Sequence, residues 1–151
     1  MKIKALVAIV ATLFAFAFTP VYADSHGDDV KRLAIQVSDN NEGTMTKVLN
    51  VAANFAKGML ESGQEYEIEI VSFNAGLHML REDTSPVLER IQGFTNSVPN
   101  VTLSACGNTI AGMTRKAGGK APVLITDAHI VPAGVVRLME LDAAGWFVIR
   151  P

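Results

Sequence analysis

Cysteine is scarce in this chain of 151 residues, which contains a single thiol at Cys106. One cysteine excludes a framework of disulfides within the chain. Clusters of Lys and Arg interleaved with aromatic residues are also missing, and this absence argues against nucleic acid as a partner. The sequence has no Walker motif, no paired-glycine dinucleotide fingerprint and no zinc-binding cluster. These absences remove several common classes of function and direct attention to the lone thiol.

The first 23 residues have the pattern of a cleavable secretory signal. Lys2 and Lys4 form a basic start, residues 5–18 are apolar, and Val21-Tyr22-Ala23 places small residues where a signal peptidase cuts. The apolar stretch is shorter than the roughly 20 residues that cross a bilayer as a helix. No cysteine follows the cut to carry a lipid. We therefore expect a periplasmic protein with a flexible polar lead at residues 24–30 and one domain at residues 31–151.

Cleavage would remove two of the 13 basic residues and none of the 15 acidic ones, which leaves a mildly acidic mature chain. The residues that remain are enough for one domain with a hydrophobic core. No second apolar segment of membrane-spanning length follows the signal. The mature protein is therefore expected to have no membrane span.

Strand-like and helix-like segments alternate along residues 31–151. Apolar strands are predicted at residues 32–37, 66–73, 101–105, 122–126 and 146–149. Helices are predicted from Thr44 to Gly63, over residues 77–81, from an N-cap at Ser85, over residues 109–116 behind an N-cap at Asn108, and over residues 132–143. This alternation is typical of a three-layer α/β/α sandwich with a five-stranded, largely parallel sheet.

Polar residues follow the predicted strands at their carboxyl ends, where an open parallel sheet binds its ligands. We expect these residues to share one edge of the sheet and to form a site. Its members are Asn40, Asn74, Cys106, Gly107, Asn108, Asp127 and His129.

Cys106 stands at the turn from a predicted strand into a predicted helix. The free N–H groups of that helix, together with Asn108, would stabilise a thiolate and lower the pKa of the thiol. Gly107 would keep the approach to the sulfur open. Such a thiolate can carry sulfur as a persulfide, form a mixed disulfide or be oxidised. A buried structural cysteine is the alternative, because free cysteines are among the most buried residues.

His129 and Asp127 are predicted to act beside this thiol. His129 would accept or donate a proton, and Asp127 would orient its ring. A loop histidine bonded to the backbone is the alternative, and a Cys-His-Asp hydrolase is conceivable from these residue types. A flavodoxin-like FMN site is disfavoured, because Asp39 and Glu42 at the start of the first predicted helix would repel phosphate.

Cleavage after Ala23 would create the amino terminus Asp24-Ser25-His26. Its free amine, two deprotonated amides and the imidazole of His26 would form a square-planar nitrogen set that suits Cu(II) or Ni(II). The alternative is a solvated tail that happens to contain a histidine. The chemistry expected at Cys106 requires no cofactor.

Four segments of the chain together resemble the DsrE/DsrF-like family, and the likeness covers residues 31–151. The segments are "RLAIQVSDN", "EIEIVSFNAGLHML", "VTLSACGNTI" and "IVPAGVVRLMELDAAGWFVIRP". Its most specific parts are the cysteine in "ACGNTI" and the closing "VPAGVVRLMEL…GWFVIRP". The resemblance implies a three-layer α/β fold that assembles as homo-oligomers, often trimers or hexamers. It also implies a sulfur relay in which a cysteine holds sulfur as a persulfide, a role that would fall on Cys106.

We therefore expect a periplasmic sulfur carrier that accepts and donates sulfane sulfur through Cys106. Its partners would be a sulfur donor or acceptor, either a protein or a small thiol. Two alternatives stay open. One is a non-catalytic oligomeric protein that binds a small ligand, and the other is a copper-binding protein that uses Asp24, Ser25 and His26.

Overall fold

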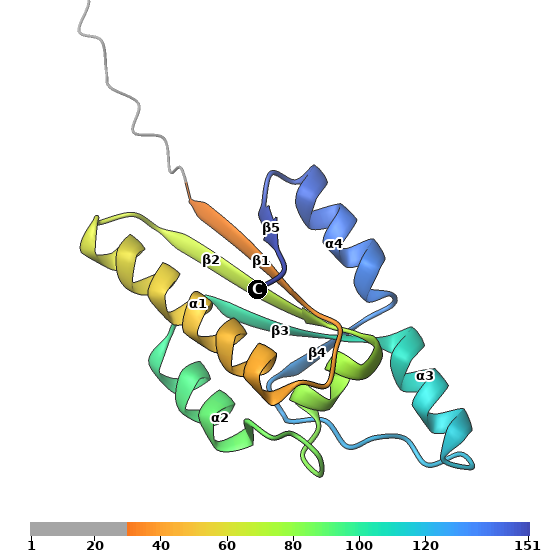
Figure 1. Ribbon diagram of the computed structural model, residues 1–151. Coiled ribbons are helices and arrows are strands. Elements are labelled where there is room, and N and C mark those ends of the chain that lie inside the picture. Colours follow the sequence, from red (N-terminus) through yellow and green to blue (C-terminus); the bar gives the residue numbers. More distant parts are fainter. Residues whose placement is uncertain (1–29) are drawn as a thin grey trace, which may run out of the picture.

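Five parallel strands in the order β4-β3-β2-β1-β5 form the sheet of residues 30–151, the part of the chain that the computed structural model describes (Figure 1). The strands are β1 (Lys31–Val37), β2 (Tyr66–Ser72), β3 (Val101–Cys106), β4 (Ala128–Val131) and β5 (Phe147–Ile149). With helices on both faces, this sheet confirms the predicted three-layer α/β fold. The predicted signal at residues 1–23 and the predicted copper site at Asp24, Ser25 and His26 lie outside the described residues.

The connections between the strands are helical. They comprise α1 (Glu42–Glu61), the 3-10 helix η1 (Asn74–Leu80), α2 (Leu88–Ser97), α3 (Gly107–Lys116) and α4 (Gly134–Ala143). None of the helices within residues 30–151 is long and apolar enough to cross a membrane.

Two helix starts differ from the predictions. The side chain of Asn41 caps α1 by accepting a hydrogen bond from the Thr44 N–H at 2.9 Å, so this helix begins at Glu42 rather than at Thr44. Ser85 does not cap α2, which begins at Leu88. The Ser85 hydroxyl instead donates to the Met79 carbonyl at 2.7 Å and fixes the turn before the helix.

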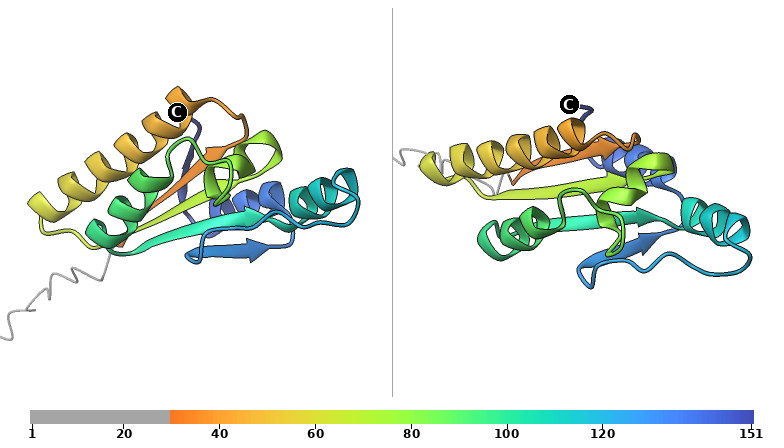
Figure 2. Two further views of the ribbon diagram at one scale, coloured as in Figure 1. Left: turned by 90° about the horizontal axis from the view of Figure 1, so that it is seen from below. Right: turned by 60° about the horizontal axis from the view of Figure 1, so that its bottom comes forward.

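Alternation along the strands divides the core between the two faces of the sheet. Leu33 and Ile35 point to the face that α1 and α2 cover, whereas Ala34 lies in the smaller cluster under α4 with Leu138 and Leu141. Both views in Figure 2 show α3 beyond the carboxyl end of β3. Because α3 projects past the sheet, within residues 30–151 the face opposite α1 is packed mainly by α4.

The fourth strand is not where the sequence predicts it. Residues 122–126 were expected to pair in the sheet, but β4 is Ala128–Val131. The predicted segment pairs instead with the chain that leaves η1. Leu124 forms an antiparallel bridge with Arg81, and the Ile125 N–H donates to the Leu80 carbonyl at 3.0 Å. This competing pairing moves the strand by about six residues along the chain, and Pro132 follows its end.

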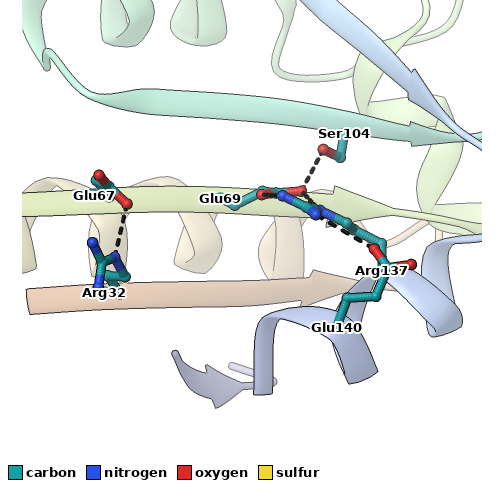
Figure 3. Close-up of polar contacts among 6 residues, drawn as sticks. All are labelled: Arg32, Glu67, Glu69, Ser104, Arg137 and Glu140. Atoms are coloured by element: carbon teal, nitrogen blue, oxygen red, sulfur yellow. Dashed lines mark hydrogen bonds and ion pairs between the residues drawn. The ribbon is translucent and has the colours of Figure 1, made fainter. Parts of the chain in front are cut away.

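A buried carboxylate attaches α4 to the sheet (Figure 3). Glu69 on β2 is 2% exposed. Arg137 on α4 donates two hydrogen bonds to its carboxylate, from Nε to Oε1 and from Nη2 to Oε2, at 2.8 Å each. The Ser104 hydroxyl on β3 donates to the same carboxylate at 2.6 Å. A charge is tolerated in the interior only when it is paired and hydrogen-bonded. The arginine fork and the hydroxyl meet that requirement.

Replacing Arg137 with Met should therefore leave Glu69 as an uncompensated buried charge. We expect the free energy of unfolding, measured by urea denaturation at neutral pH, to fall by about 3–5 kcal/mol. The control is Arg32→Met, which breaks the Arg32–Glu67 pair of 3.0 Å on the exposed part of the same sheet face. That variant should lose no more than about 1 kcal/mol. Equal losses in the two variants would contradict the role given to Glu69.

Candidate functional site

The register of β3 and β4 decides what surrounds Cys106. Cys106 is the last residue of β3 and pairs with Val131, the last residue of β4. Two helix starts therefore meet at this point, α3 directly after Cys106 and α4 three residues after Val131. A Cβ on Gly107 would lie 3.1 Å from the Val131 carbonyl oxygen, so glycine allows the two segments to approach. The Asn108 N–H then donates to the Pro132 carbonyl at 3.1 Å.

Four polar groups near the Cys106 sulfur lower the pKa of the thiol. They are the Thr109 hydroxyl and the backbone N–H groups of Gly134, Thr109 and Asn108. The Thr109 oxygen accepts the Asn74 N–H at 2.9 Å, which joins the start of α3 to the end of β2. Asn108 is not the predicted N-cap of α3. Cys106 itself holds the N-cap position, and Asn108 lies in the first turn.

Two opposing effects act on the pKa of Cys106. Burial of the sulfur disfavours the charged thiolate and raises the pKa. The Thr109 hydroxyl and the three N–H groups stabilise the thiolate and lower it. These four groups outweigh burial, so the pKa of Cys106 lies below that of an ordinary cysteine. A thiol in this environment is a better nucleophile at neutral pH than a structural cysteine buried in apolar surroundings.

A cavity of about 720 Å³ opens next to this thiol. Cys106 is only 5% exposed, but it lines the cavity and is reached from there. The walls come from the end of β2, η1, α3 and the start of α4. The lining residues are Phe73, Asn74, Ala75, His78, Cys106, Asn108, Thr109, Gly112, Met113, Lys116, Ala133, Gly134 and Val135.

The structure brings together only part of the predicted site. Asn74, Cys106 and Asn108 line the cavity, and Gly107 lies between two of them as a packing glycine. The missing side chain of Gly107 makes room for the backbone at the end of β4. Asn40 is exposed in the segment after β1 and does not line the cavity.

His129 and Asp127 are not beside the thiol. His129 lies within the edge strand β4, paired with Ser104, which is two residues or about 6.6 Å before Cys106 along β3. Asp127 precedes β4 at its opposite end and accepts a hydrogen bond from Thr95 on α2 at 3.1 Å. The displaced fourth strand explains both errors. Cys106, His129 and Asp127 therefore do not form a Cys-His-Asp arrangement.

Three further residues line the cavity, although the sequence did not identify them as site residues. His78, on η1, lines the cavity and contacts the Thr84 hydroxyl through Nδ1 at 2.8 Å. The Thr109 hydroxyl lowers the pKa of Cys106, and Lys116 lies two turns further along α3. In the sequence, only the helical spacing of Thr109 and Lys116 from Cys106 could have indicated that they lie at the site. For His78, the only such indication is its place shortly after the polar turn that ends β2.

Metal binding has no support at this site. Within residues 30–151, no group of three or more His, Cys, Asp or Glu side chains is arranged to hold a metal ion. The backbone N–H groups that act on Cys106 suit an anion better than a cation.

Comparison with known proteins supports the fold and leaves the function open. No protein-family model matches this chain, and no curated protein matches it. Among solved structures, the chain is similar to a protein of unknown function from Methanobacterium thermoautotrophicum, with 25% sequence identity and a TM-score of 0.62. The similarity covers 80% of this chain and 99% of that protein.

Replacing Thr109 with Val should raise the pKa of Cys106, because the hydroxyl that stabilises the thiolate is lost. A hydrogen bond to a charged group contributes about 1.5–3 kcal/mol, which corresponds to roughly one to two pKa units. The measurement is the rate of iodoacetamide alkylation against pH, whose inflection should move upward. Thr114→Val is the control, since Thr114 donates to the Ile110 carbonyl in the same helix at 2.8 Å. An inflection that moves equally in both variants would contradict the assigned role.

Proposed function

We propose that this protein is a periplasmic DsrE/F-like sulfur carrier that holds sulfane sulfur as a persulfide on Cys106. The observation that carries the proposal is a thiol with a lowered pKa that opens into a cavity of about 720 Å³. A structural cysteine needs neither the cavity nor hydrogen bonds that stabilise its charged form. The periplasmic location rests on the signal pattern in residues 1–23.

The transfer is a nucleophilic displacement. The Cys106 thiolate attacks the outer sulfur of a donor R–S–SH, a new S–S bond forms at Cys106, and the donor S–S bond breaks. R–S⁻ leaves with the electron pair, and the hydrogen stays on the transferred sulfur. The step consumes no separate oxidant, and an acceptor thiolate reverses it. The donors around Cys106 would stabilise the thiolate before attack and again when it is released.

His78 is better placed than His129 to assist proton transfer at this site. It lines the same cavity as Cys106, whereas His129 lies outside it. His78 also contacts Thr84, which restricts the orientation of its ring. We assign His78 the role of exchanging protons with the departing or incoming thiol.

The proposal includes assembly as a homo-oligomer, either a trimer or a hexamer. Val135, Val136 and Met139 form an apolar stripe on α4, and each is more than half exposed. They are far more exposed than Leu138 and Leu141 of the same helix, which pack on the sheet. An exposed apolar stripe on a helix is a common mark of a protein interface.

A non-catalytic protein that binds a small ligand is the second candidate. The cavity favours it, because its volume lies in the range of small-molecule sites. In that case Cys106 would be a lining residue without sulfur chemistry. Reactivity of the thiol towards sulfur donors separates the two candidates.

Mature protein incubated with polysulfide should gain about 32 Da for each sulfur atom that it accepts. The gain, read by intact mass spectrometry, should disappear on treatment with a reductant. Cys106→Ala should show no gain under the same conditions. Absence of a reducible adduct on the native protein, together with slow alkylation of Cys106, would contradict the carrier and favour the binding protein.

The native protein should sediment with a mass above that of a monomer in analytical ultracentrifugation. Met139→Glu should shift it towards the monomer, because a charge placed in an apolar interface is costly to desolvate. Leu60→Glu is the matched control, since Leu60 is 62% exposed at the end of α1, on the other face of the sheet. A monomeric native protein would contradict the assembly.

A further inference from the structure

The cavity beside Cys106 extends along one face of α3. Thr109, Gly112, Met113 and Lys116 all line it at spacings of three or four residues. From Asn108, next to the thiol, to Lys116 the helix rises by about 12 Å. The cavity therefore has a reactive sulfur near one end and an ammonium group near the other.

The charges around the cavity all favour an anion. Among its lining residues, which all lie in the described part of the chain, there is no Asp or Glu. The ionisable side chains other than Cys106 are Lys116 and His78. The N-termini of α3 and α4 both meet at the thiol end and add positive dipole ends. Within the described residues, no Asp or Glu side chain lines the cavity to repel a carboxylate near Lys116.

Between the two ends the walls are apolar. Phe73, Met113 and Val135 are the larger apolar residues of the lining, and Gly112 contributes no side chain. A Cβ on Gly112 would contact only the Arg115 Nη2, at 3.9 Å. The backbone of α3 therefore does not require glycine at this position, and the missing side chain widens the cavity.

We propose that the sulfur donor of Cys106 is a low-molecular-weight organic persulfide with a carboxylate, whose sulfur lies at Cys106 and whose carboxylate lies at Lys116. This inference rests on the proposed function and names its substrate class. The displacement is the one described above. R–S⁻ leaves as a small carboxylated thiolate, which then diffuses out of the cavity.

Two aromatic disulfides test the charge preference. 5,5′-Dithiobis(2-nitrobenzoate) is anionic and 4,4′-dithiodipyridine is neutral, and each gives a mixed disulfide on Cys106 with release of a coloured thiolate or thione. Lys116→Gln should lower the ratio of the anionic rate to the neutral rate by about two- to fivefold. Lys47→Gln, which removes the same charge from an exposed position on α1, is the control and should leave the ratio unchanged.

Substitution of Gly112 tests whether the ligand occupies the cavity. Gly112→Leu should slow both disulfides by at least about tenfold, because its side chain fills the path along α3. Gly58→Leu is the matched control, since Gly58 lies in α1 and a Cβ there meets nothing within 4 Å. Circular dichroism and urea denaturation of both variants verify that they are folded.

The outcomes separate this inference from the proposed function. A rate ratio that is equal in Lys116→Gln and Lys47→Gln would overturn the anionic small donor. If Cys106 still gains sulfur from polysulfide in that case, the carrier stands and its donor is a protein cysteine. Failure of Cys106 to gain any sulfur would overturn the carrier itself, whatever the charge preference of the cavity.

Discussion

The buried ion pair between Glu69 and Arg137 joins the sheet to α4, and the surroundings of Cys106 depend on it. Within the described residues, α4 packs on a sheet face that α3 leaves free, through Leu138, Leu141 and this ion pair. Gly134, the first residue of α4, lines the cavity with Cys106, and its N–H lowers the pKa of the thiol. A bidentate arginine fixes orientation as well as distance. Glu69 and Arg137 are both far from Cys106 in the sequence. By fixing α4, their ion pair helps to set the electrostatics at the thiol.

The thiol combines two properties that usually exclude one another. It is almost completely buried, which by itself would favour the neutral form. One hydroxyl and three backbone N–H groups near it favour the thiolate. Backbone donors at helix starts need no reorganisation when the charge forms, since the fold has already oriented them. A sulfur carrier requires both properties, because a persulfide must be formed by a thiolate and then protected from solvent.

Much of the fold was predictable because its strands are nearly continuous apolar runs. "RLAIQV" and "YEIEIVSF" mark β1 and β2 with errors of one residue at the ends. The apolar stripe of α1 was likewise apparent in its helical spacing. The fourth strand was not predictable, because "PVLIT" and "AHIV" are both apolar and adjacent. Only the pairing of Leu124 with Arg81 removes the first segment from the sheet.

The sequence alone determined that Cys106 ends a strand and begins a helix, since both patterns are local. It also indicated that Asn74 and Asn108 would lie near the thiol, because parallel strands end at one edge. Only the tertiary structure decided that Thr109, Gly134 and His78 surround the site while His129 and Asp127 do not. Which residues surround the thiol depends on the register between β3 and β4 and on the packing of η1. Both bring together residues that are far apart in the chain, so no periodic pattern in the sequence predicts them.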